Sequence, residues 1–246
     1  MKHTRFVAFS TQKGGAGKTT LTVLVASFLH YVKNYNVAVI DCDYPQYSIL
    51  QMRERDLKMA SQDEHFKRMA YEQFTRLDKK AYPVVESNTK EAVSTAEKLI
   101  SRKDFDFVFF DLPGTMNNQD LIHTLAHMDY VVTPIAADRV VMESALNYAD
   151  VVNKHIVGKS NLKAVFLLWN LVDGREKTDL YKVYEHVIAE LGLTVLKTFL
   201  PDSKRFRHEQ SESRALFRST LFPADKSLLK GSNLEVLADE LLELFK

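Results

Sequence analysis

A short segment near the start of the chain has residue types and spacing that suit the binding of a polyphosphate. It runs from Gln12 to Thr20, reads Gln-Lys-Gly-Gly-Ala-Gly-Lys-Thr-Thr, and directly follows the apolar run Phe6 to Phe9. Three of the eight glycines of the chain lie here within four residues. We interpret the segment as a strand, a glycine-rich turn and a helix that starts at Thr19. Backbone N–H groups and the positive end of the helix dipole would then face one small concavity, which favours phosphate.

The second half of this segment matches the P-loop pattern, in which a glycine, four residues and Gly-Lys-Ser/Thr follow one another. Gly17, Lys18 and Thr19 satisfy its last three positions, whereas the first glycine would fall on Gln12. A second lysine, Lys13, stands at the start of the loop. The residues that we expect to contact the nucleotide here are Lys13, Gly14, Gly15, Ala16, Gly17, Lys18, Thr19 and Thr20.

Acidic residues follow two other apolar runs, where a nucleotide-hydrolysing site needs carboxylates to hold Mg²⁺ and order water. Asp41 and Asp43 come directly after the run 37–40, and Asp111 follows the run 107–110. The carboxyl ends of parallel strands meet at one edge of a sheet, which is also where the loop at Lys18 lies. The combination predicts a metal-assisted phosphate site at that edge.

Apolar runs alternate with helical patterns along most of the chain. The expected strands are residues 5–10, 36–41, 82–86, 105–110, 129–134, 163–169 and 195–200. The expected helices lie near residues 19–33, 46–79, 89–102, 116–127, 139–157 and 178–191. This alternation predicts an α/β fold with a doubly wound, mostly parallel sheet and helices on both faces, formed by residues 1–246 as one domain.

The spelling Lys-Gly-Gly-x-Gly-Lys-Thr-Thr resembles the deviant Walker A loop of the ParA/MinD family of ATPases, which are P-loop NTPases of the SIMIBI type. The resemblance implies that Lys18 grips the β- and γ-phosphates of ATP bound to its own chain. It also implies that Lys13 reaches the nucleotide of a partner subunit when two chains form a homodimer around two ATP molecules.

The same resemblance assigns roles to the strand ends. Thr19 would ligate Mg²⁺ directly, Asp41 would lie beside the ion, and Asp111 would hold a metal-bound water. Gly114 would supply a backbone N–H near the γ-phosphate.

Asp43 would orient or deprotonate the attacking water, although its surroundings depart from the family. The usual Asp-x-Asp-Pro-Gln becomes Asp-Cys-Asp-Tyr-Pro-Gln here, with Tyr44 inserted before Pro45. This spelling resembles ParA-like proteins of conjugative transposons that are labelled TraA. A role in DNA partition or conjugative transfer would follow.

Two later residues resemble the positions with which the family holds the adenine ring. Asn170 ends the apolar run 165–169, and Pro201 follows the expected strand 195–200. Asparagine at a strand end is also a common turn residue, so the sequence leaves both readings open.

Basic residues gather late in the chain, where eight of them face four acidic residues and leave a local excess of +4. They are Lys197, Lys204, Arg205, Arg207, Arg214, Arg218, Lys226 and Lys230. Such a stretch can neutralise phosphates without reading sequence. The resemblance implies non-specific DNA binding by the ATP-bound dimer through a comparable surface, together with a ParB-like or transfer-apparatus partner protein. A solvated basic face is the plainer alternative.

Composition narrows the remaining possibilities. A net charge of +1 gives no global attraction to nucleic acid, and the single cysteine, Cys42, excludes an intrachain disulfide framework. We expect a cytoplasmic protein, because no secretory signal follows Lys2 and Arg5. The tail 233–246 is acidic, which argues against membrane binding.

Two other classes of function remain open. An ATP-dependent small-molecule ligase of the dethiobiotin synthetase type shares the phosphate loop, and a nucleotide-binding scaffold would need no turnover.

Overall fold

Strands and helices alternate as the apolar pattern predicts. The computed structural model describes residues 3–114, 119–174, 180–207 and 215–246. Its strands are β1 (Arg5–Phe9), β2 (Val37–Asp41), β3 (Val84–Glu86), β4 (Phe107–Asp111), β5 (Tyr130–Ile135), β6 (Ala164–Trp169) and β7 (Thr194–Val195). Its helices are α1 (Lys18–Tyr31), α2 (Ser48–Gln62), α3 (Glu64–Leu77), α4 (Ala92–Ile100), α5 (Gln119–Ala126), α6 (Arg139–His155), α7 (Leu180–Glu190), α8 (Lys204–Arg207), α9 (Lys226–Leu229) and α10 (Leu234–Leu244). Residues 116–118 and 178–179 of the expected helices lie outside the described residues.

The described strands form one parallel sheet in the order β3-β2-β4-β1-β5-β6-β7, which confirms the doubly wound prediction. β1 lies between β4 and β5. The register pairs Phe9 with Asp111 and Asp111 with Asp41, so β1, β4 and β2 end at the same level. The chain leaves β1 towards one side of the sheet and returns to its other side, and such a switch point is where ligands bind in open α/β sheets.

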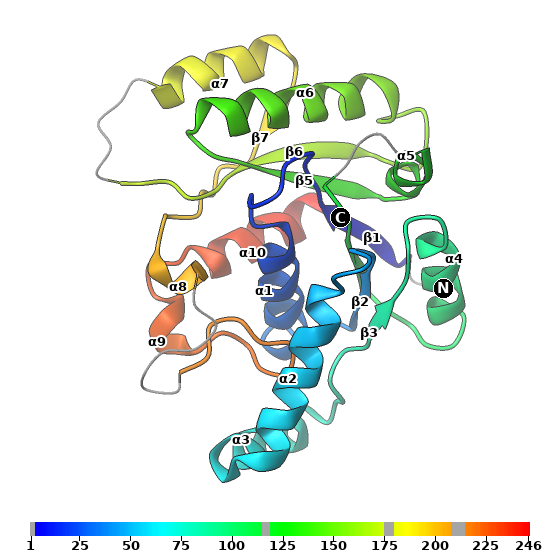
Figure 1. Cartoon of the computed structure of the whole chain (residues 1–246), viewed down its shortest axis with the longest axis vertical. Helices are drawn as coiled ribbons and strands as arrows, with labels where there is room; N and C mark the ends of the chain where they lie inside the picture. The colour runs from blue at the N-terminus through cyan, green and yellow to red at the C-terminus, as the bar shows by residue number, and fades with distance from the viewer. Residues whose placement is uncertain (1–2, 115–118, 175–179, 208–214) are drawn as a thin grey trace.

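Helices cover both faces of the sheet (Figure 1). Val7 and Phe9 of β1 pack with residues of α1 and α10 on one face. Ala8 packs on the opposite face with residues of α4, α5, α6 and α7. This alternation along β1 follows from the period of two in a strand, and burial of both faces explains its nearly continuous apolar sequence.

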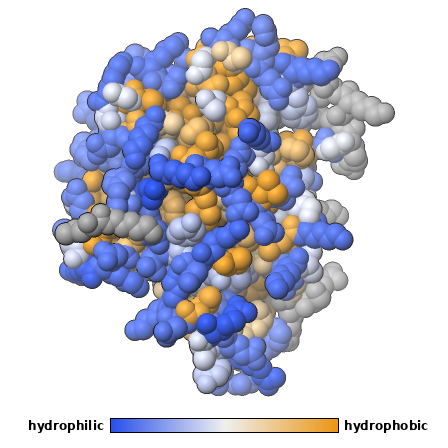
Figure 2. Space-filling view, turned by 180° about the vertical axis from the view of Figure 1, so that it is seen from behind, coloured by the Kyte–Doolittle hydropathy of each residue, from blue (hydrophilic) through white to orange (hydrophobic). Residues whose placement is uncertain are grey.

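The charged segment 46–79 forms two helices, α2 and α3, that extend from the body of the molecule (Figure 1). Asp63 separates them because its backbone is extended (φ −112°, ψ 119°) and its carboxylate accepts the N–H of His65, which caps α3. The inner face of α3 is apolar, and its Phe66 is buried against Leu221 and Phe222. Figure 2 shows that hydrophilic residues dominate this end of the molecule.

The last expected strand, 195–200, is shorter than predicted. β7 ends at Val195, although Leu196 and Leu200 still donate their N–H groups to carbonyls of β6. The intervening N–H groups of Lys197 and Thr198 donate instead to the carboxylate of Glu240 on α10, at 2.7 and 2.8 Å. A side chain of α10 thus accepts the N–H groups of Lys197 and Thr198, and the regular strand pairing ends before them.

The acidic tail is not a free segment, because α10 packs into the core. Leu234, Leu237, Ala238 and Leu241 recur at helical spacing and are buried with residues of α1. Glu235, Asp239 and Glu243 are exposed, and Asp239 contacts Lys33 at 2.7 Å, whereas Glu240 faces the segment after β7. The sequence reasoning missed this helix.

His30 is a buried histidine that the fold keeps neutral. Its Nε2 lies 3.0 Å from the carbonyl of Lys80 and therefore donates to it, and its Nδ1 accepts the N–H of Val37 at 3.4 Å. A neutral ring satisfies both contacts, whereas a second proton on Nδ1 would face a donor. Burial lowers the pKa of His30 to about 4.

We predict that His30→Gln makes stability less sensitive to acid. The unfolded ring binds a proton below about pH 6.5 while the folded ring does so only near pH 4, so His30 lowers the free energy of unfolding as the pH falls between these values. Urea denaturation at pH 7 and pH 4.5 should show a loss about 1–2 kcal/mol smaller in the variant than in the wild type. The exposed His186→Gln serves as control, and parallel pH profiles for His30→Gln and the wild type would contradict the prediction.

Candidate active site

The loop between β1 and α1 turns back at the amino end of the helix. Gly15 and Gly17 have positive φ angles of 80° and 89°, which glycine adopts without a steric penalty. Gly17 is the N-cap of α1, so the helix begins at Lys18 and its first N–H groups face the loop. The predicted strand–loop–helix arrangement is confirmed, and it offers a phosphate several backbone donors.

Thr19 and Asp111 meet in front of this loop. The hydroxyl of Thr19 donates to Oδ2 of Asp111 at 2.8 Å. Asp111 is 1% exposed, and its Oδ1 has no hydrogen-bond partner within the described part of the chain. Burial raises the pKa of Asp111 to about 7, and the charges of Asp41 and Asp43 act in the same direction. A buried carboxyl with an unpaired oxygen is a group that a cation would stabilise.

This pair fits a magnesium ion. Thr19 and Asp111 offer hydroxyl and carboxylate oxygens, which are the hard ligands that Mg²⁺ prefers. Among the described residues, no cluster of three or more histidines, cysteines or acids could hold a metal ion. A closed protein cage is also not expected, because Mg²⁺ at phosphate sites is held by one or two side chains, the phosphates and water.

Lys18 lies across the loop. Its Nζ donates to the carbonyl of Lys13 at 3.4 Å, and burial lowers its pKa while Asp111 opposes this shift. The segment after β4 comes very close, because a Cβ at Gly114 would lie 3.2 Å from both Lys18 Nζ and the carbonyl of Gln12. A side chain at 114 would therefore crowd the carbonyl of Gln12 by a few tenths of an ångström.

Asp41 supports the site from the end of β2. It is fully buried, and its Oδ2 accepts the N–H groups of Ile49 and Leu50 at 2.9 and 3.0 Å. These are orphan donors of the first turn of α2, so Asp41 caps that helix from a distance in sequence. Burial raises the pKa of Asp41, and these N–H donors oppose the rise. Its position beside Mg²⁺ stays a prediction.

The inserted residue Tyr44 is accommodated in a turn. The N–H groups of Gln46 and Tyr47 donate to the carbonyl of Asp43, and Tyr44 is 69% exposed. The Asp43 side chain remains at the carboxyl edge of the sheet, close enough to Lys18 to influence its pKa. Its role towards water stays a prediction.

Asn170 braces the phosphate loop from β6. Its Nδ2 donates to the carbonyl of Ala16 at 2.9 Å, and its Oδ1 accepts the N–H of the next residue. A Cβ at Gly17 would lie 2.8 Å from the same Nδ2. Pro201 lies further along, bridged to Val172. In this structure both the nitrogen and the oxygen of the Asn170 amide form hydrogen bonds with the backbone. The adenine contacts of Asn170 and Pro201 stay predictions.

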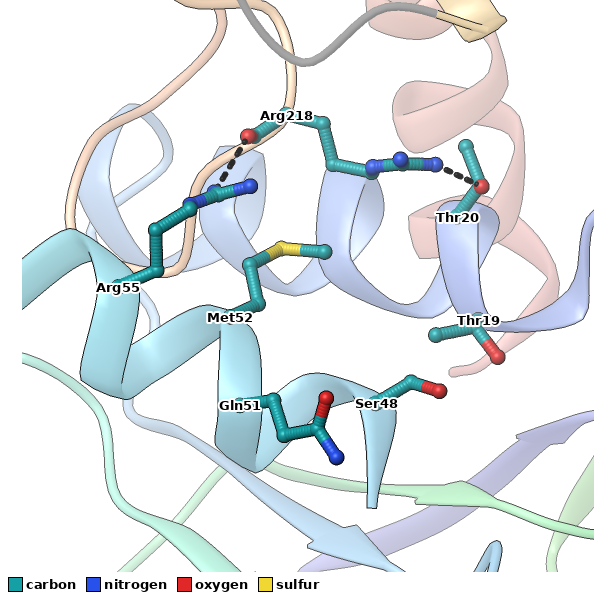
Figure 3. A pocket seen from close by; sticks show the side chains of 7 residues that line it. All are labelled: Thr19, Thr20, Ser48, Gln51, Met52, Arg55 and Arg218. Atoms are coloured by element: carbon teal, nitrogen blue, oxygen red, sulfur yellow. Dashed lines mark hydrogen bonds between the residues drawn. The ribbon is translucent and has the colours of Figure 1, made fainter. Parts of the chain in front are cut away.

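A cavity of about 530 Å³ opens beside the first turn of α1 (Figure 3). α1 contributes Thr19 and Thr20, and Arg218 comes from the segment before α9. The side chains that α2 contributes are those of Ser48, Gln51, Met52 and Arg55. The cavity thus lies between the first turn of α1, next to the phosphate loop, and α2.

Arg218 corrects the sequence reading, which counted it with the basic surface stretch. Its Nη1 donates to Oγ1 of Thr20 at 2.5 Å, so the side chain points at the phosphate loop (Figure 3). The two residues are 198 positions apart, and no motif in the sequence links them.

The remaining basic residues of that stretch differ in their environment. Lys197, Lys226 and Lys230 are exposed, while Arg205 donates to Ser203 and to the carbonyl of Lys230. Arg214 and the side chains of Lys204 and Arg207 lie outside the part that the structure describes.

Comparison with known proteins places the chain in a family. Residues 5–190 match the family model described as ATPase MipZ. The uncharacterized protein BBD21 of Borreliella burgdorferi is 30% identical over 154 residues, which are 56% of this chain and 61% of that protein. The chain thus spans about three fifths of the length of this relative.

Two solved structures share the fold over nearly the whole chain. One is a protein of Borrelia burgdorferi B31, provisionally assigned to plasmid partition and bound to AMPPNP; its TM-score is 0.63 at 18% identity, covering 98% of this chain and 99% of that one. The other is the cell division ATPase MinD of Pyrococcus furiosus, with a TM-score of 0.60 at 19% identity, covering 98% and 100%.

The fold and the loop at Lys18 define a P-loop NTPase of the ParA/MinD fold. Within that class, the chain belongs to the MipZ ATPase family.

None of the helices in the described part of the chain is both long and apolar enough to cross a membrane.

We predict that Asp111→Asn stabilises the protein in EDTA without nucleotide. The folded carboxyl keeps its proton up to about pH 7 while the unfolded one loses it near pH 3.8, so Asp111 lowers the free energy of unfolding as the pH rises through this window. At pH 8 the variant should be more stable by about 1–3 kcal/mol in urea denaturation.

Asp43→Asn is the matched control, because it neutralises a less buried acid at the same edge and should change stability by less than half as much. Equal stability of the wild type and Asp111→Asn at pH 8 would contradict the prediction, because the ionised Asp111 would then not lower the free energy of unfolding.

Proposed function

We propose that this protein is a ParA/MinD-like Mg²⁺-ATPase that binds ATP on the loop at Lys18 and hydrolyses it to ADP and phosphate. The observation that carries the proposal is the contact between Thr19 and the buried Asp111, directly beside Lys18 and the glycine loop. Family membership supports the ATPase reading. The AMPPNP bound to the B. burgdorferi structure of the same fold supports an adenine nucleotide as the ligand.

The residues divide the work by chemistry. Lys18 supplies a positive charge to the β- and γ-phosphates, and the N–H groups that follow Gly17 cradle the phosphates. Thr19 and Asp111 would hold Mg²⁺, which neutralises charge on the phosphates when it is bound. Asp43 would orient the attacking water, and Gly114, which lies against Lys18, would offer its backbone N–H to the γ-phosphate.

ATP would also control association of two chains. Asp41 and Asp111 are the last residues of β2 and β4, so a γ-phosphate and its ion beside them would order both of the loops that follow. Lys13 begins the phosphate loop and is only half-buried, which leaves it accessible to a second chain. We therefore infer a two-fold dimer in the ATP state, with Lys13 reaching the partner's nucleotide.

The cellular task that fits such a switch is plasmid partition or transfer of a conjugative element, with non-specific DNA and a ParB-like or transfer-apparatus protein as partners. The exposed Lys197, Lys226 and Lys230 are the described cations that support contact with DNA.

The phosphate-loop assignment predicts that Lys18→Ala abolishes ATP hydrolysis and weakens ATP binding at least about 100-fold, because a charge-assisted contact to the β/γ-phosphates is lost. Isothermal titration calorimetry and phosphate release measure the two effects. Lys33→Ala, at the opposite end of α1, should behave as the wild type. Turnover by Lys18→Ala at the wild-type rate would disprove the loop assignment.

The DNA assignment predicts steeply salt-dependent binding that is indifferent to sequence and stronger with ATP than with ADP. Replacing both Lys226 and Lys230 by Ala should lower the slope of log affinity against log salt by about 2 per chain, since each cation releases about one counterion. Fluorescence anisotropy with duplexes of unrelated sequence measures this slope. Lys154 and Lys159, which are exposed in and after the last turn of α6, provide the control pair. Equal affinity with ADP and ATP would remove DNA from the proposal.

A further inference from the structure

The segment that carries Arg218 is held in place by a buried carboxylate. Asp56 of α2 is fully buried, and its Oδ2 accepts hydrogen bonds from Ser219 Oγ at 2.9 Å and from the N–H and hydroxyl of Thr220 at 2.6 and 2.8 Å. From α1, Ser27 donates to the carbonyl of Ser219 and Tyr31 to that of Thr220, both at 2.7 Å. Two helices therefore fix the backbone directly after residue 218.

From this anchored position Arg218 reaches the first turn of α1. Its guanidinium donates to Thr20, the residue directly after Thr19 (Figure 3). Burial lowers the pKa of Arg218, and the nearby charge of Arg55 lowers it further. A guanidinium stays charged in proteins, so the fold holds a partly desolvated cation at the amino end of a helix.

Both charged side chains that line the cavity beside Arg218 are basic. Arg55 and Arg218 both line it, together with Thr19 and Thr20 from the amino end of α1. None of the described residues that line it is acidic. Arg55 is paired with the buried Asp56 at 2.6 Å, yet its charge still lowers the pKa of Arg218. An anion beside Arg218 would offset this repulsion.

The position of Thr20 indicates which anion this is. In a P-loop the lysine reaches the β- and γ-phosphates, the hydroxyl of the next residue binds the metal, and backbone N–H groups cradle the α- and β-phosphates. Thr20 lies one residue beyond the metal-binding position, on the side away from the γ-phosphate contact of Lys18. We propose that Arg218 binds the α-phosphate of the nucleotide, and that its bond to Thr20 holds the guanidinium ready for that contact. The inference deepens the proposed function and rests on it.

The test is the affinity of the full chain for Mg²⁺–ADP and Mg²⁺–AMPPNP, measured by calorimetry for the wild type and Arg218→Met. Both affinities should fall by about 10- to 100-fold, because a charge-assisted hydrogen bond is lost. They should fall by the same factor, since both nucleotides carry an α-phosphate. Arg218→Lys keeps the charge and should recover part of the loss.

Arg53→Met is the matched control. Arg53 lies on α2 and helps to hold the segment that carries Arg218, because it donates to the hydroxyl and carbonyl of Thr220 at 2.9 and 3.1 Å. It does not line the cavity. It should change either affinity less than about 3-fold. A loss equal to that of Arg218→Met would assign the effect to loosening of the segment and overturn the proposal.

Other outcomes are equally decisive. A loss confined to AMPPNP would place Arg218 at the γ-phosphate and overturn the α-phosphate assignment. If Arg218→Met does not fold, Arg218→Lys and Arg218→Gln carry the same comparison, since only lysine keeps the charge. Wild-type affinity in Arg218→Met, with binding lost in Lys18→Ala, would refute this inference alone; a wild type that binds neither nucleotide would refute the proposed function as well.

Discussion

The candidate site depends on the register of three parallel strands. Because the ladder pairs Phe9 with Asp111 and Asp111 with Asp41, the glycine loop and two acids emerge from the sheet at one level. A parallel sheet sends every strand end of one direction to the same edge, so the positions follow from hydrogen bonding rather than from the loops. The contact between Thr19 and Asp111 is a consequence of that register.

Three buried carboxylates show how the fold handles negative charge near this edge. Asp41 is satisfied by the free N–H groups of α2, and Asp56 by side chains and backbone of the segment 219–220. Asp111 has one oxygen that no described residue satisfies. A buried charge is costly unless it is paired, so the first two acids stabilise the local structure and the third is the one suited to a cation.

Much of the fold was predictable because local patterns carry it. Strands covered on both faces give short apolar runs, and amphipathic helices give stripes such as the one at Phe66. The elements that were missed depend on distant partners. β7 stops early because Glu240 takes the N–H groups of Lys197 and Thr198, and α10 is recognisable as a core helix only from its packing on α1.

The sequence by itself determined the phosphate loop, the acids at the strand ends and the alternation of strands and helices. These features lie within short windows, where residue type and spacing restrict the backbone directly. Only the tertiary structure decided that Asp41 caps α2, that Asn170 braces Ala16, and that Arg218 turns from the basic stretch towards Thr20. The contacts of Asn170 and Arg218 join residues 154 and 198 positions apart, and that of Asp41 joins the end of a strand to the helix that follows it. The energy of each contact depends on burial and geometry that exist only after the helices have packed on the sheet.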